Sequence, residues 1–492
     1  MFDAAADAHA ADAHAAYACA AEARTAPAPA APEAWAPSPD AEGVQAPLAT
    51  LHDYDGLPRL RRIMRAWTRP GCAYWGAEAY RRPFVEWKAP LGPRIVVISD
   101  PGMIHRLLDQ HAHDVEKHET FRRMADVTLR DGIVLSSGER WRRLRGVAGR
   151  RMSPRAVAAA EARSQTLGGG VVERIAGRGV ENVDLLREAA RYASTVVDDL
   201  LFRATSPRDF EETYEIFRDF DHGGYNLSPA SFLLGLMRPS AGARQDAQTL
   251  RKAQRLREIY GAQVAACRRR AREARPRGED APEASATLMD DLLAAGDMTD
   301  DQIVSLVLEL QYGGSHAAGA ALAFLWYVLL ARPDIAQRLR DDLASSAGEG
   351  DPPLVDAVIN ETLRLFPRAP IINRTPKAPL DLGGLRLRPG DFAIVSPWVV
   401  HRHEALWDQP NRFDPSRFLA AQGERPPRDR FIPFGVGARG CLSEHLSRAL
   451  MRSGLKRFLA LGPLRLRDPS RIGLHLTGST LSLTPALRAT RA

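Results

Sequence analysis

The sequence predicts a mainly α-helical protein with a small β portion, and three observations support this. Segments with helical periodicity outnumber β-branched runs, and the strand-like runs gather toward the two ends of the sequence. One long apolar segment, residues 300–331, is suited to run through the core of a helical protein. The chain has 492 residues, of which 45% are hydrophobic and 26% charged, as in soluble globular proteins.

The N-terminal stretch differs from the rest of the chain. Residues 1–50 contain 22 alanines and 6 prolines, a composition that cannot build a core. We expect a flexible tail there, in which residues 4–24 could form a marginal helix. Folded character is expected to begin near residues 57–67.

The first predicted element of the folded part is a strand at 94–100, a β-branched run that ends in Asp100-Pro101-Gly102. Helical periodicity follows over 102–111, 137–150, 154–176, 182–203, 208–222, 242–275, 286–295, 300–331, 333–345, 353–366 and 441–460. Short strands are predicted within 379–387, 392–396 and 474–485, and surface loops at 275–282 and 346–353.

The segment 300–331 has the clearest boundaries. Thr299 and Gln302 have the spacing of a capping box, and Pro333 ends the helix. A helix of this length extends about 48 Å. The run Gly313-Gly314-Ser315-His316 lies in its middle, and each glycine costs about 1 kcal/mol relative to alanine inside a helix. This cost suggests that something large approaches the backbone there.

The net charge of +7 comes from 62 arginines and 5 lysines against 60 acidic residues. A basic surface favours acidic partners such as nucleic acid or an anionic membrane. The excess of Arg, Ala and Pro together is better explained by a genome-wide compositional bias. No basic stripe interleaved with aromatic residues supports nucleic-acid binding.

The cysteines and the apolar runs indicate a compartment. Cys19, Cys72, Cys267 and Cys441 form neither a CxxC pair nor a disulfide framework, which favours a reducing cytosol. No signal peptide is recognisable. The longest apolar run, 317–331, has 15 residues, whereas about 18–20 are needed to span a bilayer. We therefore expect a cytoplasmic protein without a membrane anchor, most simply a monomer.

The segment 431–441 carries the strongest chemical signal. Gly435, Gly437 and Gly440 allow left-handed turns and close approach by a flat ligand. Cys441 follows, where a helix is predicted to begin, so the helix N-terminus and Arg439 are expected to lower the thiol pKa. A lone thiolate on such a hairpin suits one axial bond to a haem iron. The alternative is a buried structural cysteine.

Three further patterns are ordinary when taken alone. Glu361 and Arg364 share a helix face at i, i+3, as an exposed ion pair also would. Residues 413–418 form a proline-punctuated loop. Trp141 and Arg145 face the same way at i, i+4, either to bind an anionic edge or as part of a solvated basic face.

In order and spacing these patterns resemble the cytochrome P450 haem-thiolate family over residues 55–490. Phe434-x-x-Gly437-x-Arg439-x-Cys441 resembles its haem-binding loop, and Glu361-x-x-Arg364 its helix-K pair. Pro415-x-Arg417-Phe418 resembles its meander, and Trp141-x-x-x-Arg145 its propionate contact. The resemblance implies a single P450-like catalytic domain over residues 51–492, with the long central helix over a haem.

The same resemblance assigns roles to individual residues. Cys441 is expected to ligate the iron of haem b, with Phe434 beside the sulfur in the loop that contains Gly435 and Gly437. The haem propionates are expected to be held by Trp141, Arg145, Arg374 and Arg439. Glu361, Arg364 and Arg417 are expected to form a buried network that fixes the fold behind the haem.

The central helix departs from the family pattern. Family members usually carry a Gly-x-acid-Thr stretch over the haem, where this chain has Gly314, Ser315, His316 and Ala317. Ala317 lacks the hydroxyl that helps deliver protons. His316 titrates near neutral pH and could relay protons, or could be a hydrogen-bonded core histidine. Ser443 also stands where the family usually has glycine, which is not expected to abolish haem binding.

Three explanations of Ala317 remain open. The substrate hydroxyl or ordered water, with Ser315 or His316, could complete the proton path, which we favour. The enzyme could use peroxide as a peroxygenase, or could catalyse oxidative coupling or desaturation. A haem-binding recruitment module without catalytic activity is the alternative from another class.

The expected activity is monooxygenation, such as hydroxylation or epoxidation, of an apolar small molecule of terpenoid, fatty-acyl or polyketide-like type. The pocket is expected between 112–136, 204–240 and the middle of 300–331. The apolar residues expected in the second segment are Phe220, Tyr225, Phe232, Leu233 and Leu234, and Gln311 and His316 are expected to orient the substrate. Electrons are expected from a ferredoxin or flavodoxin with its reductase. Its docking surface is predicted from Arg142, Arg143, Arg448, Arg452 and Arg457.

Overall fold

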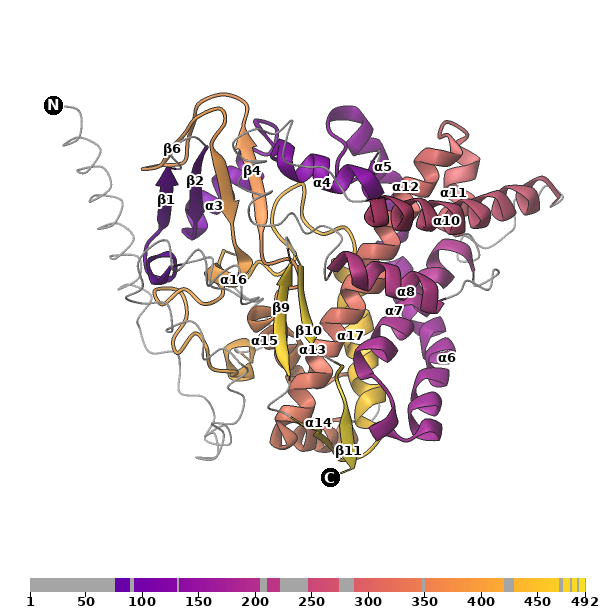
Figure 1. The fold of residues 1–492 in the computed structure, drawn as a ribbon. Helices are drawn as coiled ribbons and strands as arrows, with labels where there is room; N and C mark the ends of the chain where they lie inside the picture. The colour runs from indigo at the N-terminus through magenta and orange to yellow at the C-terminus, as the bar shows by residue number, and fades with distance from the viewer. Residues whose placement is uncertain are drawn as a thin grey trace.

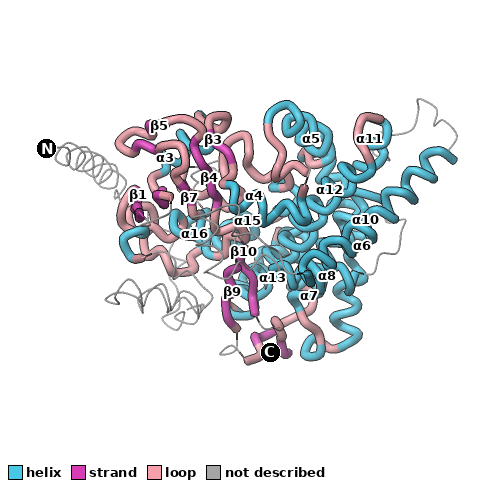
Figure 2. The backbone as a smooth tube through the Cα atoms, turned by 45° about the horizontal axis from the view of Figure 1, so that its top comes forward, coloured by secondary structure: helices cyan, strands magenta, loops and turns pink. Residues whose placement is uncertain are grey.

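In the computed structural model the main sheet lies on one side of the molecule and most of the long helices on the other, as Figures 1 and 2 show. The structure describes residues 76–88, 93–130, 132–203, 210–221, 247–273, 287–346, 350–419, 429–468, 472–477, 480–484 and 486–491. The tail at 1–50, the start predicted at 57–67, the loop at 275–282 and Tyr225, Phe232, Leu233 and Leu234 lie outside these residues.

The main sheet has five strands in the order β1-β2-β7-β4-β3. Its strands are β1 (Phe84–Lys88), β2 (Arg94–Ile98), β3 (Val115–Glu116), β4 (Ile372–Pro376) and β7 (Phe392–Val395). β2 and β7 pair in parallel, and the other neighbours are antiparallel. Val96, Val97 and Ile98 are fully buried, which explains the continuous β-branched run that predicted β2.

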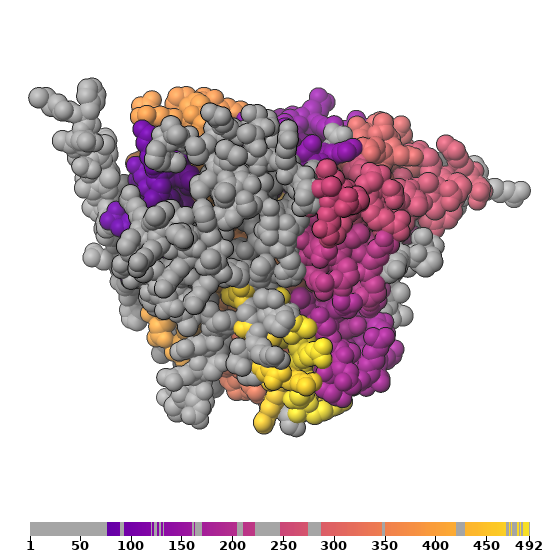
Figure 3. Space-filling model, in the orientation of Figure 1, coloured from indigo at the N-terminus to yellow at the C-terminus, as the bar shows by residue number. Residues whose placement is uncertain are grey.

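Two predicted strands are hairpins. The segment 379–387 contains the short pair β5 (Leu380–Asp381) and β6 (Arg386–Leu387). The segment 474–485 contains β9 (Gly473–Thr477) and β10 (Thr480–Thr484), paired in antiparallel register. β8 (Leu464–Leu466) pairs with β11 (Ala489–Arg491) near the C-terminus. Figure 3 shows these C-terminal residues in yellow beside the magenta helices, and β11 contacts the short turn Val180–Asn182.

The predicted helices are present, with ends shifted by a few residues. They are α3 (Pro101–His105, continued by a π-helical turn to Gln110), α5 (Gly138–Arg151), α6 (Pro154–Arg178), α7 (Leu185–Phe202), α8 (Phe210–Asp219), α10 (Ala247–Glu273), α11 (Leu288–Ala295), α14 (Pro333–Ser345), α15 (Pro353–Leu365) and α17 (Glu444–Leu459). Three helices were not predicted: α4 (Glu119–Leu129), in the predicted connection 112–136, and the four-residue helices Ala77–Tyr80 and α16 (Pro397–Val400).

The long central segment is interrupted. α12 (Asp300–Gln311) and α13 (Ala318–Ala331) are joined by a wider π-helical segment, η10 (Tyr312–Ala317). The capping box of Thr299 and Gln302 forms as predicted. α13 packs against α7 and α17, while α12 packs against α10 and α4. Because a widened turn reorients the side chains that it carries, the residues of η10 face several neighbours at once.

The hydrophobic core follows this central helix. Leu322, Phe324 and Leu325 of α13 are fully buried, and the Phe324 ring stacks on Phe366 with centroids 4.9 Å apart. Gly454 of α17 lies against Leu322, because a Cβ atom at Gly454 would come within 2.6 Å of that side chain. The core therefore holds α13 and α17 in fixed positions on the helical side of the molecule.

Candidate functional site

The loop before α17 is shaped by two glycines. Gly435 and Gly437 both have φ of +72°, the left-handed region that favours glycine. A Cβ atom at Gly437 would lie 2.3 Å from the carbonyl oxygen of Leu108. At Gly437 it is therefore the backbone of Leu108, and not a flat ligand, that comes close to the loop. The Cys441 N–H donates to the Phe434 carbonyl oxygen at 2.8 Å and closes the hairpin.

The predicted low pKa of Cys441 is wrong. α17 begins at Glu444, three residues after the cysteine, so the thiol does not lie at the helix N-terminus. Burial raises the thiol pKa more than hydrogen bonds from Ser443 and the charge of Arg145 lower it. A thiolate at this position therefore needs a further positive charge, such as a metal ion bound to the sulfur.

Cys441 is accessible to solvent. Protein atoms nevertheless surround the thiol densely enough to raise its pKa. A side chain with both properties faces an enclosed space. The sulfur lies 3.5 Å from the Ser443 hydroxyl. Ser443, the departure from the family pattern, therefore contacts the thiol without blocking access to it.

Two arginines and a tryptophan surround the same loop. Arg145 donates to the carbonyl oxygen of Gly440 at 2.9 Å, next to Cys441. The Arg439 guanidinium lies 4.3 Å from the centre of the Trp141 ring and donates to the Ser136 carbonyl oxygen. Trp141 is 8% exposed, and its buried indole N–H has no hydrogen-bond partner. Such an orphaned donor costs about 1–3 kcal/mol unless a ligand accepts from it.

Arg374 and Lys117 add two more cations. Arg374 lies on β4, and burial, with Arg439 second, lowers its pKa to about 10. Burial, with Arg374 second, lowers the pKa of Lys117 to about 7. Among the described residues, no carboxylate forms an ion pair with Arg145, Arg374, Arg439 or Lys117. Sequence reasoning missed Lys117, because a lone lysine before α4 belongs to no motif.

These residues fit a haem. Its two propionates are anionic acceptors for the four cations and the indole N–H of Trp141. Its iron supplies the positive charge that the buried Cys441 thiolate needs. Open space is also present on the central helix, since nothing lies within 4 Å of a Cβ atom placed at Gly313. Ala317, one helical turn later, is half-buried.

Gly314 has a different environment from Gly313. A Cβ atom at Gly314 would lie 3.1 Å from Val197 of α7, and one at Gly319 would lie 2.5 Å from the backbone of Ala190. The glycine pair predicted that a large group approaches the central helix. At Gly314 that group is α7, which packs against the helix there. Of these two glycines, Gly313 is the one that borders open space among the described residues.

Ser315 and Gln311 also face α7. The Ser315 hydroxyl donates to Gln311 Oε1 at 2.6 Å, and Gln311 Nε2 donates to Asp198 Oδ1 at 2.6 Å. Gln311 is fully buried. Both side chains are thus engaged in joining two helices. The expectation that Gln311 orients the substrate is not supported, because its amide is already bonded within the helix packing.

His316 faces α8. Its Nε2 lies 2.7 Å from the Asp221 carboxylate, just beyond the end of α8, and both side chains are buried. The ring lies among Tyr312, Phe217 and Tyr214, with centroids 5.8 to 5.9 Å away. Sequence reasoning missed Asp221, which is 95 residues away in the chain and belongs to no motif.

Glu309 ties the central helix to the loop before α5. Its carboxylate accepts hydrogen bonds from the backbone N–H groups of Ile133 and, at 2.9 Å, Val134. A Cβ atom at Gly132 would collide with this carboxylate, at 2.2 Å. Burial raises the pKa of Glu309 to about 7, although these N–H groups and Lys117 oppose the shift.

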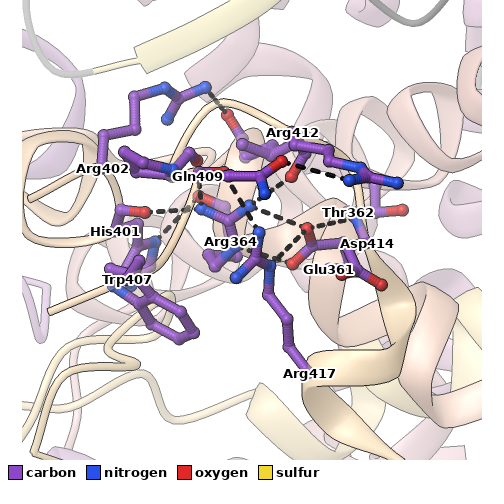
Figure 4. A network of polar contacts seen from close by, with 12 residues as sticks. Glu361, Thr362, Arg364, His401, Arg402, Trp407, Gln409, Arg412, Asp414 and Arg417 are labelled. Carbon is purple, nitrogen blue, oxygen red and sulfur yellow. Dashed lines mark hydrogen bonds and ion pairs between the residues drawn. The ribbon is translucent and has the colours of Figure 1, made fainter. Parts of the chain in front are cut away.

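The structure brings Glu361, Arg364 and Arg417 together behind the loop, as Figure 4 shows. Arg364 donates to both Glu361 oxygens at 2.6 and 2.7 Å, with neither side chain exposed. It also donates to the carbonyl oxygens of His401, Pro410 and Arg412. Arg417 Nε lies 3.5 Å from Glu361. The pair is therefore buried and fully hydrogen-bonded, rather than exposed on a helix face.

The predicted basic surface is largely paired with acids. Arg143 forms an ion pair with Asp297, Arg448 with Glu444 at 3.0 Å, and Arg452 with Asp356 at 2.7 Å. Arg142 is exposed and has no ion pair among the described residues. The five arginines thus present less net charge than their number suggests.

A helical fold with a lone accessible cysteine on a glycine hairpin, next to unpaired cations, is the arrangement expected of haem-thiolate proteins. A family model described as Cytochrome P450 matches residues 80–461. The chain therefore belongs to the cytochrome P450 family, as the sequence motifs predicted, and this family membership implies a haem cofactor.

Curated relatives match over shorter stretches. A cyclooctatin synthase of Streptomyces melanosporofaciens is 33% identical over 157 residues, which are 30% of this chain and 34% of the relative. A pentalenene oxygenase of Streptomyces avermitilis is 32% identical over 180 residues, or 33% of this chain and 40% of the relative. The matches thus span about a third to two-fifths of these relatives.

Solved structures match over most of the chain. P450BioI, in complex with an acyl carrier protein ligated to hexadec-9Z-enoic acid, has a TM-score of 0.63 and 15% identity, covering 83% of this chain and 95% of that one. HmtN, a post-tailoring hydroxylase involved in himastatin biosynthesis, has a TM-score of 0.61 and 19% identity, covering 84% and 94%. At these identities the likeness shows the fold, which is the mainly helical P450 fold that was predicted.

By length and composition, one helix among the described residues could cross a membrane. It is Asp300–Ala331, and 89% of its most apolar window is buried inside the protein. This is the central helix of the fold, whose apolar surface is covered by α7, α10 and α17.

Proposed function

We propose that this cytochrome P450 is a haem-thiolate monooxygenase that oxidises an apolar small molecule, with Cys441 as the ligand of haem b. The accessible thiol on its glycine hairpin carries this proposal. Trp141, Arg145, Arg374, Arg439 and Lys117 would hold the propionates, because among the described residues none of these cations forms an ion pair with a carboxylate and the Trp141 N–H has no acceptor. When bound there, haem supplies the chemistry that inserts one oxygen atom of dioxygen into substrate, with electrons and protons from outside.

The protein's own residues shape the rest of the site. Glu309 holds the loop at Ile133 and Val134 against the central helix, which fixes one wall of the pocket. Gly313 and Ala317 leave space on the face of the central helix. His316 lies one residue before Ala317, with its ring bonded to Asp221.

A terpenoid is the substrate class that we favour. The names of the two Streptomyces relatives support this class over fatty-acyl or polyketide-like substrates. The acyl carrier protein complex of P450BioI does not favour a fatty-acyl substrate here, because at 15% identity that likeness concerns only the fold.

Electrons would come from a separate ferredoxin or flavodoxin with its reductase, in the cytoplasm. Arg142 supports this docking proposal, because its guanidinium is exposed and has no ion pair among the described residues. Of the predicted surface, Arg143, Arg448 and Arg452 contribute less, since each already has an acidic partner.

Ala317 favours one alternative. A methyl group at this position cannot donate a proton, so a peroxygenase, which obtains its oxygen from peroxide, is the second candidate function, together with coupling or desaturation. Comparing turnover by hydrogen peroxide with turnover by NADPH and redox partners distinguishes the two. A recruitment module without catalytic activity would give substrate-dependent product with neither.

The decisive test compares two cysteine variants. The reduced wild-type protein with haem and carbon monoxide is expected to show the absorption band typical of thiolate ligation. Cys441→Ser is expected to lose this band, whereas Cys267→Ser, at a buried cysteine of α10, is expected to keep it. A band that persists in Cys441→Ser overturns the assignment. Product formation from cyclic terpenes by the wild-type protein tests the activity itself.

A further inference from the structure

Asp221 is the centre of a buried polar cluster that joins four parts of the chain. Its Oδ1 accepts from the Tyr312 hydroxyl at 2.7 Å and from the Thr480 hydroxyl at 3.3 Å. Its Oδ2 lies 2.7 Å from His316 Nε2 and accepts from the Arg368 guanidinium. Asp221 is only 2% exposed, so this cluster is shielded from solvent.

The charges of the cluster determine which ring nitrogen of His316 carries a hydrogen. Burial alone would raise the pKa of Asp221, but Arg368 and His316 hold it well below its usual range. An ionised carboxylate can only accept hydrogen bonds, so His316 Nε2 must be the donor. In the neutral ring, Nδ1 then carries no hydrogen and can accept a hydrogen bond.

Arg368 balances the charge of Asp221 within the cluster. Its guanidinium pairs with the same carboxylate oxygen that lies next to His316 Nε2. The buried carboxylate therefore has a cationic partner besides the histidine.

The His316 ring is also fixed in orientation. It stacks on Tyr312 at an interplanar angle of 20° and is tilted by 41° against Phe217 and 57° against Tyr214. Rotation of the ring would break the hydrogen bond to Asp221 and disturb these contacts. His316 belongs to the widened turn η10, between Gly313, which borders open space among the described residues, and the half-buried Ala317.

We propose that Asp221 is a positioning residue that fixes the orientation and the tautomer of His316, so that Nδ1 is held as a hydrogen-bond acceptor in the widened turn of the central helix. This rests on the proposed monooxygenase function. Asp221 thereby supplies, from beyond the end of α8, a carboxylate next to position 316, where the central helix has His316 in place of the acid of the family pattern. The role differs from that of Glu361, whose carboxylate contacts only the network behind the loop.

The test uses the full-length, haem-loaded protein with a substrate that it oxidises. Asp221→Asn is expected to lower the product formed per NADPH several-fold, with the electrons diverted to peroxide or water. Iodosylbenzene donates a single oxygen atom and leaves as iodobenzene, without needing protons, so turnover with it is expected to stay within about twofold of the wild type. Asp219→Asn, at an exposed pair with Lys252 on the same helix, is the matched control.

A second readout does not depend on turnover. In protein labelled with ¹⁵N-histidine, the signals of His316, assigned by their loss in His316→Gln, are expected to show a protonated Nε2 and an unprotonated Nδ1. Asp221→Asn is expected to mix the two tautomers. The double variant Asp221→Asn/His316→Asp moves the carboxylate onto the central helix, so that Arg368 still has an anionic partner. It is expected to recover part of the product formed per NADPH that Asp221→Asn loses.

The outcomes separate this inference from the proposed function. Coupling in Asp221→Asn equal to that of the wild type, or an equal loss with NADPH and with iodosylbenzene, overturns the positioning role alone. An unchanged His316 tautomer in Asp221→Asn does the same. A wild-type protein that makes no product with either oxygen source overturns the proposed function as well.

Discussion

The Arg439 guanidinium stacks on the Trp141 ring at 4.3 Å, while the indole N–H of Trp141 points to no acceptor. The cation and the unused donor lie together on the side of the site where Arg374 and Lys117 are also unpaired. Among the described residues none of these cations forms an ion pair with a carboxylate, although Glu309 is near enough to Lys117 to influence its pKa. This relationship is the basis for assigning the haem propionates to this corner of the site.

Trp141→Phe is expected to weaken haem binding while keeping the stacked ring. A hydrogen bond to a charged acceptor contributes about 1.5–3 kcal/mol, which corresponds to a roughly 10- to 100-fold loss of affinity. Titration of the apoprotein with haemin measures this. Trp326→Phe is the control, because the Trp326 N–H already donates to the Gly454 carbonyl oxygen. It should reduce stability and leave haem affinity unchanged; equal haem affinities in wild type and Trp141→Phe would contradict the assignment.

Lys117 is expected to make haem binding depend on pH. Its pKa in the protein without haem is lowered to about 7, so above pH 7 it is mostly neutral. A nearby propionate would raise this pKa, and binding would then take up a proton. Haem affinity should therefore fall as pH rises from 7 to 9, by up to about tenfold per pH unit from this group.

Lys117→Gln should remove the part of the pH dependence of haem affinity that comes from the lysine. Deprotonation of Cys441 makes haem affinity rise with pH, and comparing Lys117→Gln with the wild type at each pH cancels that effect. Glu309, which interacts with Lys117, also titrates near pH 7. Repeating the comparison in the Glu309→Gln background isolates the lysine. Parallel pH profiles for wild type and Lys117→Gln would show that Lys117 does not face the propionates.

The buried pair of Glu361 and Arg364 is expected to be essential for folding. Arg364→Lys keeps the charge but cannot replace five hydrogen bonds, and leaving a buried carboxylate poorly paired costs about 3–5 kcal/mol. Urea unfolding measures this loss. Arg452→Lys, at the more exposed pair with Asp356, is expected to cost less than about 1 kcal/mol. Similar losses in the two variants would mean that the network is not specially important.

Ala317→Thr is expected to raise the product formed per NADPH, because a hydroxyl group next to His316 adds a proton donor to the open face of the central helix. Ala317→Val has nearly the same shape without the hydroxyl and serves as the control. Coupling is measured as product and peroxide per NADPH consumed. If the two variants behave alike, the missing hydroxyl does not limit the reaction.

Much of the fold could be predicted because local signals specify it. The capping box at Thr299 and the Pro333 stop bound the central helix through contacts within a few residues. The π-helical widening at Tyr312–Ala317 was not predicted, although Gly313 and Gly314 marked the place. α4 was missed although its apolar residues do follow a helical period, because the helix is short and polar on average.

By itself, the sequence determined the family, the cysteine hairpin and the i, i+3 pair of Glu361 and Arg364, because these depend on residues close together in the chain. Only the tertiary structure decided that Asp221 meets His316 and Arg368, across 95 and 147 residues, and that Lys117 joins the unpaired cations. It also reversed the expected pKa shift of Cys441. Contacts and burial between distant segments depend on how whole helices pack, which no short pattern encodes.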